Sequence, residues 1–351
     1  MNGAELCGAF YAEAVRPLLG DLRHSAGLLG SGSEVLGFDD QRSTDHHWGP
    51  RVMIFVDDAD VGRAADIRDQ LAAQLPKRFG PYSTHFTEPN LEDHGTQLLA
   101  DTDGPVNHRV DILTVAAWSR IYLGFDATVA PTVTDWVATP SQLLAGVTSG
   151  PVYHDGLGEL APMQARLEWY PDDVWRYVLS AQWRRISQED HFVGRTAEVG
   201  DDLGSRLLAG RLARDMIRLA FLIERRHAPY VKWLGSAFRQ LALAADLGPA
   251  LDDAVAASTF AEREAALARG YEVVMAATNA LDLAPAPEPT VRPFFGRGFL
   301  VTMGERFADA LHGSITDGDV LALPQHLGAV DQYVDSTDAL SYPSVLRHIV
   351  R

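Results

Sequence analysis

The sequence predicts an α+β protein in which a mixed N-terminal domain is followed by a mainly helical domain. In the first 150 residues, compact apolar runs such as Arg51–Val56 alternate with amphipathic segments, as strands and helices that share a core do. From Pro171 onward, Arg, Ala and Leu dominate at helical spacing and residues that favour strands become rare. We therefore predict an α/β domain over residues 1–150 and a mainly helical domain over residues 151–351.

Apolar periodicity places the elements of the N-terminal domain. Leu6, Phe10 and Ala14 are spaced as on one face of a helix over residues 3–19. Short apolar runs predict strands, and the run over 110–115 contains one carboxylate, Asp111. The expected order is a helix over 3–19, an apolar stretch over 26–29, a strand over 51–56, a helix over 61–75 and a strand over 110–115.

The C-terminal domain reads as a series of helices with one linker-like stretch. Helical periodicity covers residues 173–189, 203–226, 230–245 and, with breaks, 250–281. Residues 283–289 contain three prolines, which fix the backbone and remove hydrogen-bond donors. The tail beyond Arg292 includes Phe294, Phe295 and Phe299, and we expect so apolar a segment to pack back onto the body.

Composition excludes several classes of function. With 30 basic and 47 acidic residues the chain carries a formal charge of −17, which repels a phosphate backbone or an acidic membrane surface. The single cysteine, Cys7, excludes multi-cysteine zinc sites and is expected to be buried. No signal peptide or membrane-spanning run is evident. We expect a cytoplasmic protein that acts on a small molecule, not on nucleic acid or at a membrane; the sequence does not indicate an oligomeric state.

The most informative segment lies between residues 28 and 56. Gly30-Ser31-Gly32-Ser33 follows a short apolar stretch, and its missing side chains let backbone amides approach a ligand closely. Serine hydroxyls and such amides can hold a phosphate. Asp45 follows about a dozen residues later, shortly before the next strand, where a carboxylate could hold a divalent cation. This arrangement suits a metal-bridged nucleoside triphosphate.

A Gly-Ser turn, a short helix and an acidic residue at a strand resemble the motif of the nucleotidyltransferase superfamily, which includes the aminoglycoside nucleotidyltransferases. In that family Gly-Ser contacts the triphosphate, two acids in an Asp-x-Asp pattern bind two metal ions, and a third acid lies on a later strand. The resemblance places Gly32-Ser33 or Gly30-Ser31 at the Gly-Ser position, Asp45 at the first acid and Asp111 at the third. It implies a nucleotidyltransferase-like mixed sheet, a nucleoside triphosphate as substrate, and Mg²⁺ or Mn²⁺ bound by Asp45, His47 and Asp111.

More specifically, the chain resembles an uncharacterised bacterial family of nucleotidyltransferase-like proteins that carry a domain of unknown function. The phrases GSGSEVLGFDD, STDHHWGPR, QWRRISQED, FVGR and YVKWLG support this resemblance. The chain departs from the superfamily at the second acid, where Asp45-His46-His47 places a histidine. Histidine prefers softer ions than Mg²⁺, which favours oxygen ligands. This leaves an altered one-metal transferase, a nucleotide-binding protein without activity, or another reaction at the same place.

The helical domain offers basic residues for an anionic ligand. Arg185, Arg195 and Lys232 are candidates to contact phosphate or acceptor. Simpler alternatives are an ion pair between Arg185 and Glu189 on one helix face, and a Lys232 side chain that lies over an apolar patch. Arg214 and Arg218 extend a charged stripe on the next helix.

Three functions remain open. The first is metal-assisted transfer of a nucleotidyl group from a nucleoside triphosphate to a small acceptor, with Asp45, His47 and Asp111 at the reaction centre. The second is a glycosidase-like hydrolase that uses paired carboxylates, drawn from Asp45, Asp111, Asp39 and Glu34. The third is a nucleotide-binding protein without turnover. Glu34, Asp39 and Asp40 lie in a polar segment, and we expect their side chains to be largely solvated.

Overall fold

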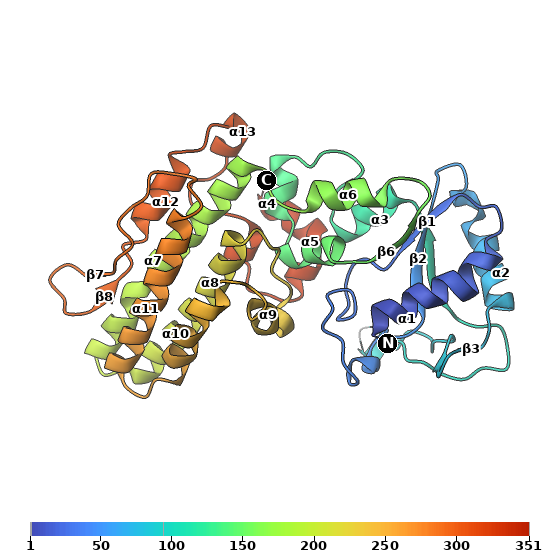
Figure 1. Cartoon of the computed structure of the whole chain (residues 1–351), viewed down its shortest axis with the longest axis horizontal. Helices are drawn as coiled ribbons and strands as arrows, with labels where there is room; N and C mark the ends of the chain where they lie inside the picture. The colour runs from blue at the N-terminus through green and yellow to red at the C-terminus, as the bar shows by residue number, and fades with distance from the viewer. Residues whose placement is uncertain (1, 94, 351) are drawn as a thin grey trace. The chain divides into compact units, whose positions relative to one another are not determined.

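The computed structural model describes residues 2–93 and 95–350, without the side chains of Asp45 and Val350. The chain divides into two compact units (Figure 1). Unit 1 contains Met1–Pro131 and Leu143–Glu168, and unit 2 contains Thr132–Gln142 and Trp169–Arg351. The chain therefore enters unit 2 briefly, returns to unit 1, and leaves it again after residue 168, whereas the sequence analysis places one boundary at residue 150.

Unit 1 is built on a small mixed sheet with the strand order β5-β2-β1-β6. Strand β1 pairs antiparallel with β2 and with β6, whereas β2 and β5 run parallel. The strand predicted at 51–56 is confirmed, and the one predicted at 110–115 begins and ends slightly earlier. The bounds are β1 His24–Gly27, β2 Arg51–Val56, β5 Arg109–Leu113 and β6 Val152–Asp155.

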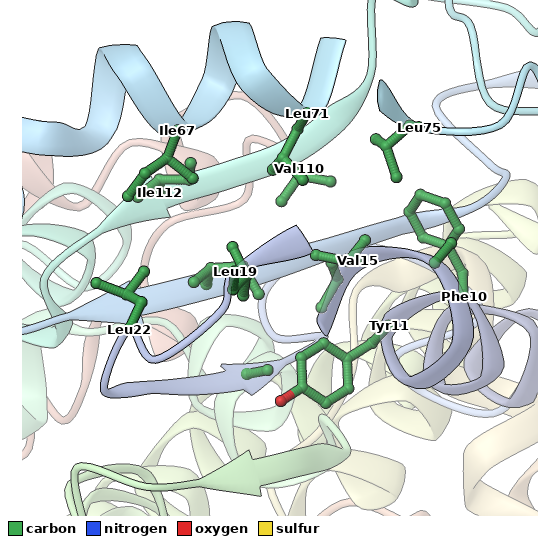
Figure 2. Close-up of a cluster of buried hydrophobic side chains, with 14 of the residues drawn as sticks. Phe10, Tyr11, Val15, Leu19, Leu22, Ile67, Leu71, Leu75, Val110 and Ile112 are labelled. Atoms are coloured by element: carbon green, nitrogen blue, oxygen red, sulfur yellow. The ribbon is translucent and has the colours of Figure 1, made fainter. Parts of the chain in front are cut away.

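One face of this sheet is covered by helices and forms the core of unit 1 (Figure 2). Because side chains alternate along a strand, Val110 and Ile112 of β5 point to this face. In Figure 2, Ile67 and Leu71 of α2 (Ala64–Gln74) lie over them. The predicted helix over 3–19 begins as α1 (Gly3–Phe10) and continues as a π turn and a 3₁₀ turn.

The intervening positions of the strands point away from this core. In β5 they are Arg109, Asp111 and Leu113, which pair in register with Arg51, Met53 and Phe55 of β2. The loop that follows β1 begins beside β2, to which β1 is paired. The remaining elements of unit 1 include α3 Val115–Tyr122, α6 Leu160–Leu167 and the short hairpin of β3 Arg78–Phe79 and β4 Tyr82–Ser83, and α5 Ser141–Thr148 begins in unit 2 and continues in unit 1.

Unit 2 is helical, as the sequence predicts. The long helices α7 and α8 pack along one another, and α10 packs against α11 and α8 (Figure 1). The predicted helix at 230–245 is instead two elements, α9 and the start of α10, and residues 283–289 form neither helix nor strand. The bounds are α4 Val133–Ala138, α7 Asp172–Glu198, α8 Asp202–Ile223, α9 Val231–Phe238, α10 Ala244–Ala256 and α11 Phe260–Asn279.

The tail beyond residue 292 lies against the long helices of unit 2. Helix α12 (Glu305–His312) packs on α7, where Phe307 stacks on Trp183 with ring centroids 4.5 Å apart. Phe299 is buried next to Gly194 of α7. The last helices are α13 Gly318–Leu321 and α14 Pro343–Val350. Within the described residues, no helix combines the length and the apolar character that crossing a membrane requires.

Candidate functional site

The loop after β1 is shaped by glycines that no other residue could replace without strain. Gly30 has φ +96° and Gly32 has φ +150°, in the region that favours glycine. The Gly30 N–H donates to the Gly146 carbonyl oxygen at 3.0 Å. A Cβ atom on Gly32 would lie 2.8 Å from Glu34 Oε2 and 2.9 Å from Arg51 Nη2. The loop is therefore held close to two charged side chains.

These two side chains, Glu34 and Arg51, form a buried ion pair. Arg51 Nη2 and Nε donate to Glu34 Oε1 at 2.6 and 3.0 Å, and Nη2 also donates to the Ser31 carbonyl oxygen at 3.2 Å. Burial acts to lower the pKa of Arg51, but the charge and hydrogen bonds of Glu34, together with smaller effects of Cys7 and Asp111, raise it overall. The expectation that Glu34 is solvated is wrong, because only 6% of it is exposed. In this structure Glu34 fixes the loop through Arg51, and its predicted catalytic role stays a prediction.

Arg109 begins β5 and lies beside Arg51, with which it pairs in register. Its Nη1 donates to Gln97 Oε1 at 3.0 Å and to His47 Nδ1. Burial and the charges of Arg109 and Arg51 lower the pKa of His47, so that its ring is neutral and Nδ1 can accept. No carboxylate of the described side chains lies within ion-pair distance of Arg109. This guanidinium is therefore a positive charge that no carboxylate compensates directly.

Asp111 lies two residues beyond Arg109 on the same strand face. Although its strand is apolar, the Asp111 side chain is exposed, because the pleat directs it away from the helical core. Burial and the Arg51 charge lower the pKa of Arg109, and the Asp111 charge opposes this shift. The face thus presents one exposed carboxylate close to two guanidinium groups.

The predicted metal site finds no support among the described residues. No three His, Cys, Asp or Glu side chains in the described ranges gather as ligands of one ion. His47 Nδ1 is occupied by Arg109, and the neighbouring guanidiniums repel a cation. The described side chains therefore do not fit a Mg²⁺ or Mn²⁺ centre. Asp45 ends a 3₁₀ turn, and its side chain lies outside the described residues, so its role as a ligand stays a prediction.

The segment after the glycine loop also differs from the resemblance. Residues 33–37 form turns, not the short helix expected there, with the Leu36 N–H bonded to the Gly32 carbonyl oxygen at 3.3 Å. The strand β2 begins only at Arg51. Asp45 therefore precedes the strand by several residues and does not lie on it.

The basic candidates of the helical half all lie in unit 2. Arg185 binds Asp215 at 3.0 Å and the Gln332 carbonyl oxygen at 2.9 Å, so the expected pair with Glu189 is wrong. Arg195 is exposed, and Lys232 lies 4.9 Å from the centre of the Trp233 ring, as the alternative interpretation expected. A ligand shared by these three residues and the loop of unit 1 stays a prediction.

Sequence reasoning missed Arg51, Arg109, Gln97 and Tyr122. Tyr122 is partly buried beside Gly30 and hydrogen-bonds the Ser31 side chain; burial raises its pKa to about 12, and the Ser31 bond only partly opposes this. Two of the four left a signal in the sequence. Arg51 and Arg109 each stand at the first position of an apolar strand, where a buried cation needs a partner.

Comparison with known protein families gives a match over part of the chain. The sequence model of a family described as a domain of unknown function (DUF4037) matches residues 136–234. The matched stretch runs from α4 to α9 and begins after the glycine loop, β2 and β5. No curated protein matches the chain. The match supports the expected domain of unknown function, and the link to nucleotidyltransferases rests on the sequence resemblance alone.

Proposed function

We propose that unit 1 binds a nucleoside triphosphate at the loop over residues 30–33 and transfers its nucleotidyl group to a small acceptor. One observation carries the proposal. In the described part of the chain, the three successive backbone N–H groups of residues 31–33 donate to no protein acceptor. The loop adjoins Arg51, and Arg109 lies beside Arg51 on the neighbouring strand. Successive free N–H groups beside guanidiniums suit a phosphate chain.

The chemistry asks little of the protein beyond positioning and charge neutralisation. An acceptor oxygen forms a bond to the α-phosphorus, the bond from that phosphorus to the bridging oxygen breaks, and pyrophosphate leaves. Arg109 offsets the phosphate charge, since no described carboxylate pairs with it. Asp111 provides an exposed carboxylate that can take the proton of the acceptor hydroxyl.

A second candidate is nucleotide binding without turnover. It is favoured because His47, at the position of the second acid, is held by Arg109, and because no three-ligand metal cluster exists among the described residues. The glycosidase-like alternative gains less support. Glu34 is occupied by Arg51, and Asp39 accepts from the Gly3 N–H at 2.7 Å.

Binding and turnover separate these candidates. Titration calorimetry with each nucleoside triphosphate, with and without Mg²⁺ or Mn²⁺, should detect binding. Replacing Arg109 by Gln should weaken it about tenfold or more, because a hydrogen bond to a charged group contributes roughly 1.5–3 kcal/mol. Arg78→Gln, which alters an exposed ion pair in the same unit, is the matched control and should bind normally.

Pyrophosphate release in the presence of a set of small hydroxylated and amino acceptors then tests transfer. If the native protein releases pyrophosphate and the Asp111→Asn variant does not, nucleotidyl transfer is supported. Binding without release under any metal supports the second candidate, and absence of binding contradicts both.

A further inference from the structure

Unit 2 contains a cavity with a volume of about 120 Å³. It lies among α7, α8, α9 and the segment over residues 329–340, and every lining residue belongs to unit 2. One water molecule needs roughly 10–15 Å³ of such space, so the cavity can hold a small organic molecule. Much of its wall is apolar, formed by Tyr170, Val178, Phe221, Leu222, Leu234 and Leu340.

The polar part of the wall has a surplus of hydrogen-bond donors. Arg214 uses Nη1 and Nη2 to bind Asp335 at 2.9 and 3.3 Å, but its Nε is buried and has no partner within the described residues. Trp169 Nε1 is likewise buried and, in the described ranges, unpartnered. Both atoms can only donate, and an unmet buried donor is costly. A ligand with oxygen acceptors would satisfy both.

The charged groups of the wall also favour a ligand with an oxyanion. Its two carboxylates already have partners: Asp335 binds Arg214, and Asp331 Oδ2 accepts from the Ser141 N–H at 2.8 Å. Arg218 donates to the Asp331 carbonyl oxygen. No carboxylate of the described side chains lies within ion-pair distance of the Arg218 or Arg226 guanidinium. Burial raises the pKa of Asp331, and the nearby Arg218 charge opposes this shift.

We propose that this cavity binds a small organic acid, with its oxyanion facing Arg218 and Arg226 and its apolar body against Tyr170 and Phe221. Each oxygen of the oxyanion can accept more than one hydrogen bond, so the same oxygens also accept from Trp169 Nε1 and Arg214 Nε. A guanidinium binds carboxylate and phosphate with the same donor geometry, so the shared requirement is an oxyanion on an apolar body. The site goes beyond the proposed function, because none of its residues belongs to the loop or the strands of unit 1.

Four probes test this chemistry on the full-length protein. Benzoate and phenyl phosphate carry an oxyanion on a ring, benzamide carries the ring without the charge, and inorganic phosphate carries the charge without the ring. We expect benzoate or phenyl phosphate to bind, and benzamide and inorganic phosphate to bind at least about tenfold more weakly. Whichever of the two aromatic acids binds more tightly shows whether the site prefers a carboxylate or a phosphate ester. Equal binding of benzamide, or no binding of either aromatic acid at millimolar concentration, overturns the proposal.

Variants locate the binding. Arg226 is exposed, so Arg226→Gln should fold normally and weaken binding of the aromatic acid about tenfold. The matched control is Arg239→Gln, also exposed in unit 2 and outside the cavity wall, and it should bind as the native protein does. Unchanged affinity in Arg226→Gln together with Arg218→Gln refutes the site.

The indole N–H resonance of Trp169, assigned with Trp169→Phe, gives a direct reading of the donor. It should move downfield when the acid binds, and an unmoved resonance at saturation contradicts the proposed contact. Nucleoside triphosphate binding, measured in the same variants, should not change. If the nucleotide proposal for unit 1 fails, the organic-acid proposal for unit 2 is unaffected, and the reverse also holds.

Discussion

Replacing Glu34 by glutamine tests the ion pair that holds the glycine loop. Glutamine keeps nearly the same shape and can accept one hydrogen bond from Arg51, but it removes the charge. The Glu34 and Arg51 side chains are 6% and 11% exposed, so the substitution leaves a cation almost out of water. Removing one partner of a buried ion pair costs roughly 3–5 kcal/mol, and the retained hydrogen bond places the expected loss near the lower value.

Scanning calorimetry can measure this loss. For a domain the size of unit 1, each kcal/mol lowers the melting temperature by roughly 2–4 °C, so we expect a decrease of about 6–12 °C in its transition. Glu13→Gln, at an exposed position with no ion-pair partner among the described side chains, is the control and should have little effect. Combining Glu34→Gln with Arg51→Met should recover part of the loss, because the stranded charge is then removed. A decrease below about 2 °C for Glu34→Gln alone would refute the reasoning.

Three further predictions concern unit 1. Burial acts to raise the pKa of Asp155, but hydrogen bonds from the start of α6 and from Ser25 lower it overall. This carboxylate therefore stabilises the fold above about pH 4, and the stabilisation is lost as the pH falls through the pKa that Asp155 has in the folded protein. Asp155→Asn should therefore lower stability at pH 7 by roughly 2 kcal/mol in urea unfolding, with the difference shrinking in acid. Burial raises the pKa of Cys7 to about 11, so its thiol should react with a disulfide reagent at pH 8 only after denaturation. Gly146→Ala would place a methyl group 2.5 Å from the Gly30 carbonyl oxygen. Chemical denaturation should show a decrease of about 1–3 kcal/mol in the free energy of unfolding. An unchanged midpoint would show that the loop shifts to accommodate the methyl group.

The elements that were predicted well are those whose apolar pattern repeats over several turns or fills a short strand. Strand β2 and helices α7 and α8 follow such patterns, because burial of one stripe or one face is required wherever the chain packs. Strand β6 was not predicted. Its four residues are all half-buried, and it is held to β1 by pairing across more than a hundred residues of sequence.

The candidate site was predicted in part. The loop at Gly30 and Gly32 is a tight backbone feature that composition alone suggests, and both glycines adopt the conformation that favours them. The partners of its neighbours could not be predicted in the same way. Glu34 binds Arg51, and His47 binds Arg109. Which residues meet is set by the register of the strands and the path of the loops, and both depend on the whole sheet.

The discontinuous course of the chain limits how this protein can be divided. A fragment that stops at Pro131 would keep β1, β2 and β5 but lack β6, and the edge of β1 would lose its partner. A fragment limited to the family match over 136–234 would carry β6 without β1 and α7 without α12. Each fragment lacks strands or helices that cover its apolar faces in the intact chain. Both fragments should therefore expose unpaired strand edges or apolar surface and aggregate. Expression of the intact polypeptide, with substitutions in place of truncations, is the sound route to dissecting it.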